Sequence, residues 1–111
     1  LSSKLNIISS ISFVPNFCNK LGINQHYIKL IKLITKLSET LPEISENTPP
    51  ATAAGVIYFV SEICDLKLSK KHISQKCDVS QVTINKCYKK LIIFKDLFFT
   101  NDIKKIFNLN I

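Results

Sequence analysis

The sequence predicts an all-helical domain, and three observations support this fold class. Apolar residues recur at the spacing of helical turns through almost the whole chain, and no alternating strand pattern with hairpin turns appears. Capping residues and prolines stand where these periodic segments begin. The length of 111 residues suits one hydrophobic core, and the apolar content of 46% argues against disorder. No apolar run reaches the roughly 18 residues of a membrane-spanning helix, so no membrane partner is expected.

The first two predicted helices are bounded by a glycine and an asparagine. The first helix is expected near residues 12–21 and ends before Gly22, a residue that is favoured after the last helical turn. Asn24 is a suitable N-cap for a second helix that reaches about residue 39. The polar stretch 40–48 follows, and its proline and polar residues predict a loop.

The third predicted helix, over residues 51–65, has no polar face. It starts at Thr48-Pro49-Pro50, where a capping residue precedes two prolines that fit the first helical turn. A helix that is apolar nearly all round must be surrounded by other elements, so this helix is expected at the centre of the core. Gly55 costs about 1 kcal/mol of helix propensity. Close approach of a neighbouring helix is the expected reason for its presence.

Two short helices joined by a tight turn end the strongly patterned part of the chain. Ser69 is the expected N-cap of a helix over residues 70–77, and Ser80 that of a helix from residue 81 to about residue 91. The connection, residues 78–80, is only three residues long. This arrangement is typical of a helix-turn-helix.

The positive charge of the chain is concentrated in the same segment. The net charge is +7, and all fifteen basic residues are lysines. Eight lysines and a single acid, Asp78, fall within residues 66–95, so this segment accounts for the whole surplus, while the rest of the chain is balanced. The asymmetry predicts an electropositive patch suited to a polyanion such as nucleic acid. The alternative interpretation is a solvated lysine face on an ordinary pair of helices.

The last of these helices has two distinct faces. Four residues with i, i+3, i+4, i+7 spacing are expected to face the core: Ile84, Cys87, Tyr88 and Leu91. The opposite face would place base-reading groups in the first turns and cations farther along, as a recognition helix requires. The candidate base-reading residues are Gln81, Val82 and Asn85. The candidate phosphate-binding residues are Lys70, Lys71, Ser80, Thr83, Lys86, Lys89 and Lys90.

Three short motifs occur in an order and spacing that are typical of one protein family. They are Phe13-x₃-Phe17-x₃-Leu21, then Thr48-Pro49 followed by Ala53, Ala54, Ile57 and Tyr58, then Val79-x₂-Val82-Thr83-Ile84-x₃-Tyr88-Lys89-x-Leu91. From Phe13 to Phe99 the chain thereby resembles the second, C-terminal cyclin-like repeat of the transcription factor IIB family. The resemblance implies an all-α, five-helix cyclin-like domain over residues 13–99, with the helix-turn-helix at its fourth and fifth helices. Residues 1–12 would be a linker or the end of a preceding element, and residues 100–111 a tail or short helix.

The resemblance also implies a function. The chain would be a fragment of a general transcription initiation factor that docks beside TATA-binding protein and enters the major groove of double-stranded promoter DNA. RNA polymerase would be a partner through the full-length protein, the nucleus the compartment, and no cofactor is expected in this fragment. In the family the residues at Val82 and Asn85 read bases, the second usually being Arg, and Gly is usual at Asp78.

The departure at Asn85 suggests a base preference of its own. An asparagine amide pairs with the N6/N7 edge of adenine, and a valine such as Val82 can contact a thymine methyl group. The two residues would therefore suit an AT-rich promoter. The alternative is that Asn85 merely lies exposed and contributes little base preference.

Other functional classes make different predictions. The competing interpretation is a protein-binding cyclin-like module, or a polymerase III IIB-related factor, without direct DNA contact. Such a module needs an exposed apolar groove, for which Phe94, Phe98 and Phe99 are candidates unless they pack in the core. An enzyme is not expected, because paired carboxylates, a glycine-rich phosphate loop and a metal-ligand cluster are absent from the sequence. Four cysteines without zinc-ligand spacing are expected to be buried thiols of an intracellular protein: Cys18, Cys64, Cys77 and Cys87.

Overall fold

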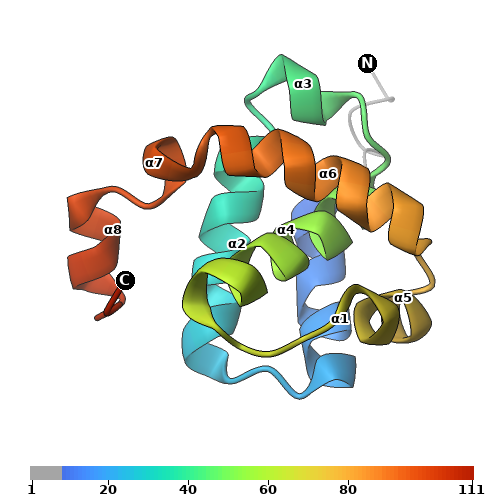
Figure 1. Cartoon of the computed structure of the whole chain (residues 1–111), viewed down its shortest axis with the longest axis horizontal. Coiled ribbons are helices and arrows are strands. Elements are labelled where there is room, and N and C mark those ends of the chain that lie inside the picture. The colour runs from blue at the N-terminus through green and yellow to red at the C-terminus, as the bar shows by residue number, and fades with distance from the viewer. Residues whose placement is uncertain (1–8) are drawn as a thin grey trace.

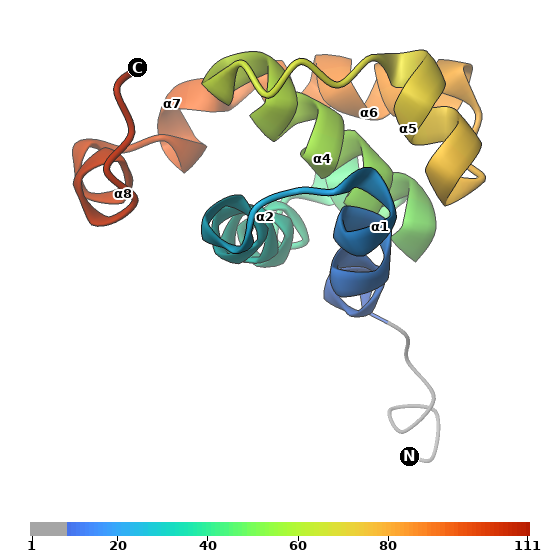
Figure 2. The same cartoon turned by 90° about the horizontal axis from the view of Figure 1, so that it is seen from below.

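Helix α4 (Pro49–Cys64) lies at the centre of the structure, a computed structural model that describes residues 9–111 (Figure 1). Ten of its sixteen residues are buried. In the second view, α4 lies between α6 on one side and α1 and α2 on the other (Figure 2). The expectation of a central helix without a polar face is therefore confirmed, and its burial follows from the apolar residues that surround it on all sides.

Five helices of eight or more residues make up the domain, so the predicted all-α, five-helix fold is confirmed. They are α1 (Val14–Leu21), α2 (Gln25–Ser38), α4, α5 (Lys70–Cys77) and α6 (Gln81–Ile93). Shorter elements accompany them: the 3₁₀ helix η2 (Ser10–Phe13), α3 (Pro42–Ser45), α7 (Lys95–Phe98) and α8 (Asn101–Ile106). Helix α3 corrects the loop expected over residues 40–48. Its proline occupies the first helical turn, where a missing N–H leaves no bond unmade.

Most of the predicted helix boundaries are confirmed by their capping bonds. Gly22 ends α1 in the left-handed conformation, with φ 68°. The hydroxyl groups of Ser69 and Ser80 each accept a hydrogen bond from the backbone N–H three residues on, at 3.0 and 3.1 Å. Thr48 precedes α4 as expected, but its side chain makes no capping bond. The prolines at the first two helical positions lack an N–H, which removes one of the usual donors.

Helices α4 and α6 approach each other closely at Gly55. A Cβ built on Gly55 would lie 2.5 Å from the Cβ of Cys87 and closer still to its Sγ. No residue larger than glycine fits at this position without displacing α6, so the predicted close approach is confirmed.

An aromatic cluster closes the core between α4 and the C-terminal segment. Phe59 is fully buried, and its ring centroid lies 5.7 Å from that of Phe98 and 5.5 Å from that of Phe99. Phe98 and Phe99 are 1% and 3% exposed, and Phe94 is half-buried. These aromatics therefore pack with the core, and Phe98 also lines a small pocket together with Leu37, Thr40 and Leu97.

The residues just after α8 contact α2. The Nε2 atom of His26, near the start of α2, lies 2.6 Å from the carbonyl oxygen of Phe107, just after α8. Most of the expected linker over residues 1–12 lies outside the described residues, and the domain boundaries stay predictions. Within residues 9–111, no helix combines the length and the apolar run that crossing a bilayer requires.

Candidate nucleic-acid interface

The turn between α5 and α6 fixes the angle at which α6 leaves the core. Asp78 ends α5 with φ 57°, the left-handed region that glycine adopts without strain and that aspartate tolerates better than most residues. Val79 is buried and packs with the core. Ser80 then caps α6. The predicted helix–turn–helix pattern of this segment is therefore present, with a buried valine anchoring its turn.

Helix α6 is divided into an inner and an outer face, as its sequence predicts. Ile84, Cys87 and Leu91 are buried, and Tyr88 is half-buried. Val82, on the opposite side, is 64% exposed. The helix is thus held by its inner face, and the side chains opposite are available for a partner.

Five of the candidate contact residues share or adjoin the outer face of α6. Successive residues are about 100° apart around the helix axis, so residues three or four positions apart lie on the same side of α6 from its first turn to its third. Asn85 is half-buried and the other members are exposed: Gln81, Val82, Lys86 and Lys89. Ile93, which is 77% exposed, lies on the same side at the end of the helix and was not among the predicted site residues.

Two other candidates lie on the flank of α6 away from Asn85. Helical geometry places Thr83 and Lys90 roughly 140–160° around the axis from Asn85. The hydroxyl of Ser80 donates a hydrogen bond to the Thr83 hydroxyl at 2.8 Å, so its proton is used within the cap. The Thr83 hydroxyl keeps its own hydrogen for a further acceptor. The predicted residues therefore form one outer face and one separate flank.

Lys70 joins α5 to α6 through a direct contact. Its Nζ donates a hydrogen bond to Oδ1 of Asn85 at 3.2 Å and lies 5.7 Å from the centroid of the Tyr58 ring. The ring of Tyr58 packs edge-on against that of Tyr88, with centroids 5.0 Å apart. Of the two predicted lysines at the start of α5, Lys70 is half-buried and Lys71 is exposed.

Tyr58 is a residue of this site that the sequence reasoning missed. Burial, the nearby carboxylate of Glu62 and the Tyr88 phenol raise the pKa of Tyr58, so its hydroxyl stays neutral at physiological pH. A neutral ring can contact the Lys70 ammonium through its face without forming an ion pair. The available signal was a tyrosine within the apolar run over residues 53–60.

The segment that holds the site is strongly basic. Asp78 is the single acid within residues 66–95, which carry eight lysines. The described part of the chain holds no group of three or more His, Cys, Asp or Glu side chains suited to a metal ion. Burial raises the pKa of Cys87 to about 11 and that of Cys18 to about 12, so both thiols are protonated and inert at neutral pH.

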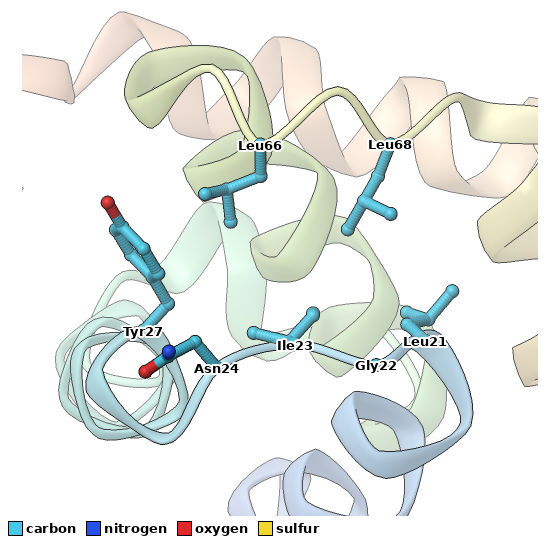
Figure 3. A pocket seen from close by; sticks show the side chains of 7 residues that line it. All are labelled: Leu21, Gly22, Ile23, Asn24, Tyr27, Leu66 and Leu68. Atoms are coloured by element: carbon cyan, nitrogen blue, oxygen red, sulfur yellow. The ribbon is translucent and has the colours of Figure 1, made fainter.

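A small apolar pocket lies between the α1–α2 connection and the segment that links α4 to α5 (Figure 3). Its volume is about 210 Å³. Aliphatic side chains dominate its lining, and four of them are Leu21, Ile23, Leu66 and Leu68. A pocket of this size suits one or two apolar side chains of a partner.

Comparison with known proteins gives consistent similarities. The family described as "Transcription factor TFIIB repeat" matches residues 3–93. The chain is 30% identical to transcription initiation factor IIB of Dictyostelium discoideum over 98 residues, which are 88% of this chain and 30% of that protein. It is 30% identical to transcription initiation factor IIB of Oryza sativa subsp. japonica over 104 residues, 94% of this chain and 33% of that protein. For transcription initiation factor IIB of Methanosarcina mazei the identity is 30% over 92 residues, 82% of this chain and 27% of that protein.

The chain therefore spans about a third of the length of the curated relatives it matches. No solved structure matches it at a significant level.

Proposed function

We propose a function from one premise: the chain belongs to the transcription factor TFIIB repeat family. This is a family of transcription factors and not of enzymes. Within it, we propose that the chain is the second, C-terminal repeat of a general transcription initiation factor. The repeat binds promoter DNA beside TATA-binding protein, and its α5–turn–α6 segment enters the major groove.

One observation carries the proposal. The segment that holds the whole charge surplus of the chain also contains the outer face of α6, on which Gln81, Val82, Lys86 and Lys89 are exposed and Asn85 is half-buried. Sequence-independent binding of DNA depends on cations that neutralise phosphates, and sequence reading depends on side chains at the N-terminal turns of a recognition helix. On the outer face of α6, Lys86 and Lys89 support the first role, and Gln81, Val82 and Asn85 support the second.

The proposed roles follow the arrangement of the side chains. Gln81, Val82 and Asn85, in the first two turns of α6, face the base edges. The lysines farther along α6 and at the start of α5 contact phosphates, together with the Thr83 hydroxyl, which Ser80 orients by donating a hydrogen bond to it. With Ser80 in this supporting role, the phosphate-binding set comprises Lys70, Lys71, Thr83, Lys86, Lys89 and Lys90. Thr83 and Lys90, on the separate flank, would contact the strand across the groove from Lys70 and Lys71.

The partners of the whole protein are part of the same proposal. They are TATA-binding protein, promoter DNA and RNA polymerase, the last through the parts of the protein beyond this repeat, with the nucleus as the compartment. The repeat would extend over residues 13–99, followed by a C-terminal tail over residues 100–111 that includes α8.

A gel shift on a TATA duplex, with and without TATA-binding protein, tests the proposal. The double variant Lys86→Glu/Lys89→Glu should lower the affinity at least about tenfold, because two phosphate contacts become repulsive. The matched control is Lys29→Glu/Lys32→Glu, which makes the same change of charge on the exposed face of α2. Equal losses in both double variants would contradict the assignment of the surface to α6.

The salt dependence of binding provides a second readout in the same assay. If about five lysines neutralise phosphates, the slope of log K against log salt should be roughly −4.5. The control variant on α2 should keep this slope, whereas Lys86→Glu/Lys89→Glu should flatten it. Binding that is insensitive to salt would count against a phosphate-binding surface.

The second candidate function is that of a protein-binding cyclin-like module, or a polymerase III IIB-related factor, that makes no direct DNA contact. The apolar pocket between Leu21 and Leu68 is the observation that favours it. Under this alternative, the chain alone does not shift the duplex, but it adds a further shift to the complex of the duplex with TATA-binding protein. Both pairs of charge reversals leave this further shift unchanged. Substitution of a pocket residue, such as Leu68→Asp, would then abolish the further shift.

A further inference from the structure

Lys70 and Lys71 are neighbours in the sequence, but the structure gives them different surroundings. Lys71 is exposed. Lys70 is half-buried, and its ammonium is held at two points, by the face of the Tyr58 ring and by Oδ1 of Asn85. A lysine that serves only as a mobile phosphate contact needs neither of these partners.

The contact fixes the orientation of the Asn85 amide. An ammonium group has three donors and no acceptor, so the oxygen of the amide, and not its nitrogen, must face Lys70. The hydrogen bond of 3.2 Å is formed accordingly. The Nδ2 group of Asn85, with two N–H donors, is therefore directed away from Lys70 and is free for a partner.

This orientation of the amide changes which base edge Asn85 and Lys70 can recognise together. Adenine in the major groove requires both an acceptor for its N6 amino group and a donor for N7. In Asn85 the oxygen accepts a hydrogen bond from Lys70, and although its second lone pair stays open, the adenine N6 amino group would there bring a further donor beside the Lys70 ammonium. Guanine presents two acceptors, N7 and O6, and requires only donors. Nδ2 of Asn85 can donate to one of them, and a remaining N–H of Lys70 to the other.

We infer that Lys70 is a specificity-determining residue, which positions the Asn85 amide so that the two side chains together select guanine at the base pair facing Asn85. The inference rests on the proposed function and replaces the expectation of adenine, which treated Asn85 as a free amide. It assigns Lys70 a role in sequence reading in addition to phosphate binding, and it leaves Lys71 with phosphate binding alone.

Selection of binding sites tests the inference on the 111-residue chain with TATA-binding protein present. The duplex carries a TATA element whose upstream flank is randomised. The chain should enrich guanine over adenine by at least about fivefold at one base pair, the lower end of what a good pair of base contacts discriminates. Asn85→Ala identifies this base pair as the one whose preference disappears.

Three variants at the start of α5 then separate the roles of the two lysines. Lys70→Met keeps the aliphatic stem over Tyr58 but removes the donor, and it should abolish the guanine preference at the base pair identified with Asn85→Ala. Lys70→Arg keeps a cation and donors and should retain the preference. Lys71→Met, the matched control, should weaken binding to all sequences by a similar factor without altering the preference. Circular dichroism confirms that each variant is folded.

The outcomes distinguish the inference from the function on which it rests. If the chain binds duplexes but enriches adenine at this base pair, or no base, the inference is wrong and the proposed function stands. The same holds if Lys70→Met and Lys71→Met change binding identically. If the chain binds no duplex and causes no shift in the presence of TATA-binding protein, both are overturned.

Discussion

Helices α4 and α6 pack against each other, but they relate to solvent in opposite ways. Along α4, every residue from Ala51 to Ser61 is buried except Tyr58, which is half-buried. Along α6, three residues are buried, and the face opposite them carries lysines, an amide and an exposed valine. The difference indicates that α4 contributes most to stability, whereas side chains on the outer face of α6 can change with little effect on the fold.

The largest effect is expected for Phe59→Ala in α4. Phe59 is fully buried among aromatic rings, so its truncation removes apolar contact and leaves a cavity. The free energy of unfolding should fall by about 3–5 kcal/mol, a large part of the 5–15 kcal/mol of a typical domain. Urea denaturation measures the change.

Substitutions on the outer face of α6 should change the free energy of unfolding much less than Phe59→Ala does. The variant Lys86→Glu/Lys89→Glu should alter the free energy of unfolding by less than about 1 kcal/mol, since both lysines are exposed. A loss comparable to that of Phe59→Ala would show that stability and binding are not separated between the two helices.

An intermediate effect is expected where the two helices touch. Gly55→Ala should lower the free energy of unfolding by about 2 kcal/mol, because overpacking against Cys87 outweighs the gain in helix propensity. A double-mutant cycle with Cys87→Gly provides the control, since removing the Cys87 side chain makes room for the new methyl group. The cycle should give a favourable coupling of about 1 kcal/mol or more. Strictly additive effects would contradict the direct contact.

The smallest effect is expected for Asp78→Gly in the turn before α6. Glycine relieves the left-handed backbone at φ 57° but increases the freedom of the unfolded chain, so a gain of about 0.5 kcal/mol should remain. The change also removes the single acid of the basic segment and should strengthen DNA binding in the gel shift. Asp65→Gly, at the left-handed residue that ends α4 with φ 56°, is the matched control. It should give a similar gain in thermal stability without any change in affinity.

Most of the fold could be predicted because its signals are local in the sequence. The caps Ser69 and Ser80 and the stop at Gly22 act within one helical turn, and the structure places them as expected. The inner face of α6 follows from helical periodicity alone. Helix α3 was missed because a single turn of four residues carries no periodic pattern.

The arrangement of the site was less predictable, because it depends on contacts between distant residues. Lys70 and Asn85 are fifteen positions apart, and Tyr58 belongs to a different helix from either. Sequence spacing along α6 placed Asn85 near the outer face but could not show that a lysine from α5 donates a hydrogen bond to its oxygen. For this reason the base preference inferred from the residue type alone differs from the one inferred from the contact.

The missing side chain at Gly55 has a consequence for the way DNA would be recognised. It lets the Cys87 side chain of α6 pack directly on the α4 backbone, so α6 cannot move closer to α4 without a steric clash, and we expect the proposed recognition helix to be rigid. A duplex that meets such a rigid element must itself supply the adjustment, through groove width and the bending of its base steps. Promoters with flexible steps beside the contacted base pairs should therefore bind more tightly than stiff ones with identical contacts.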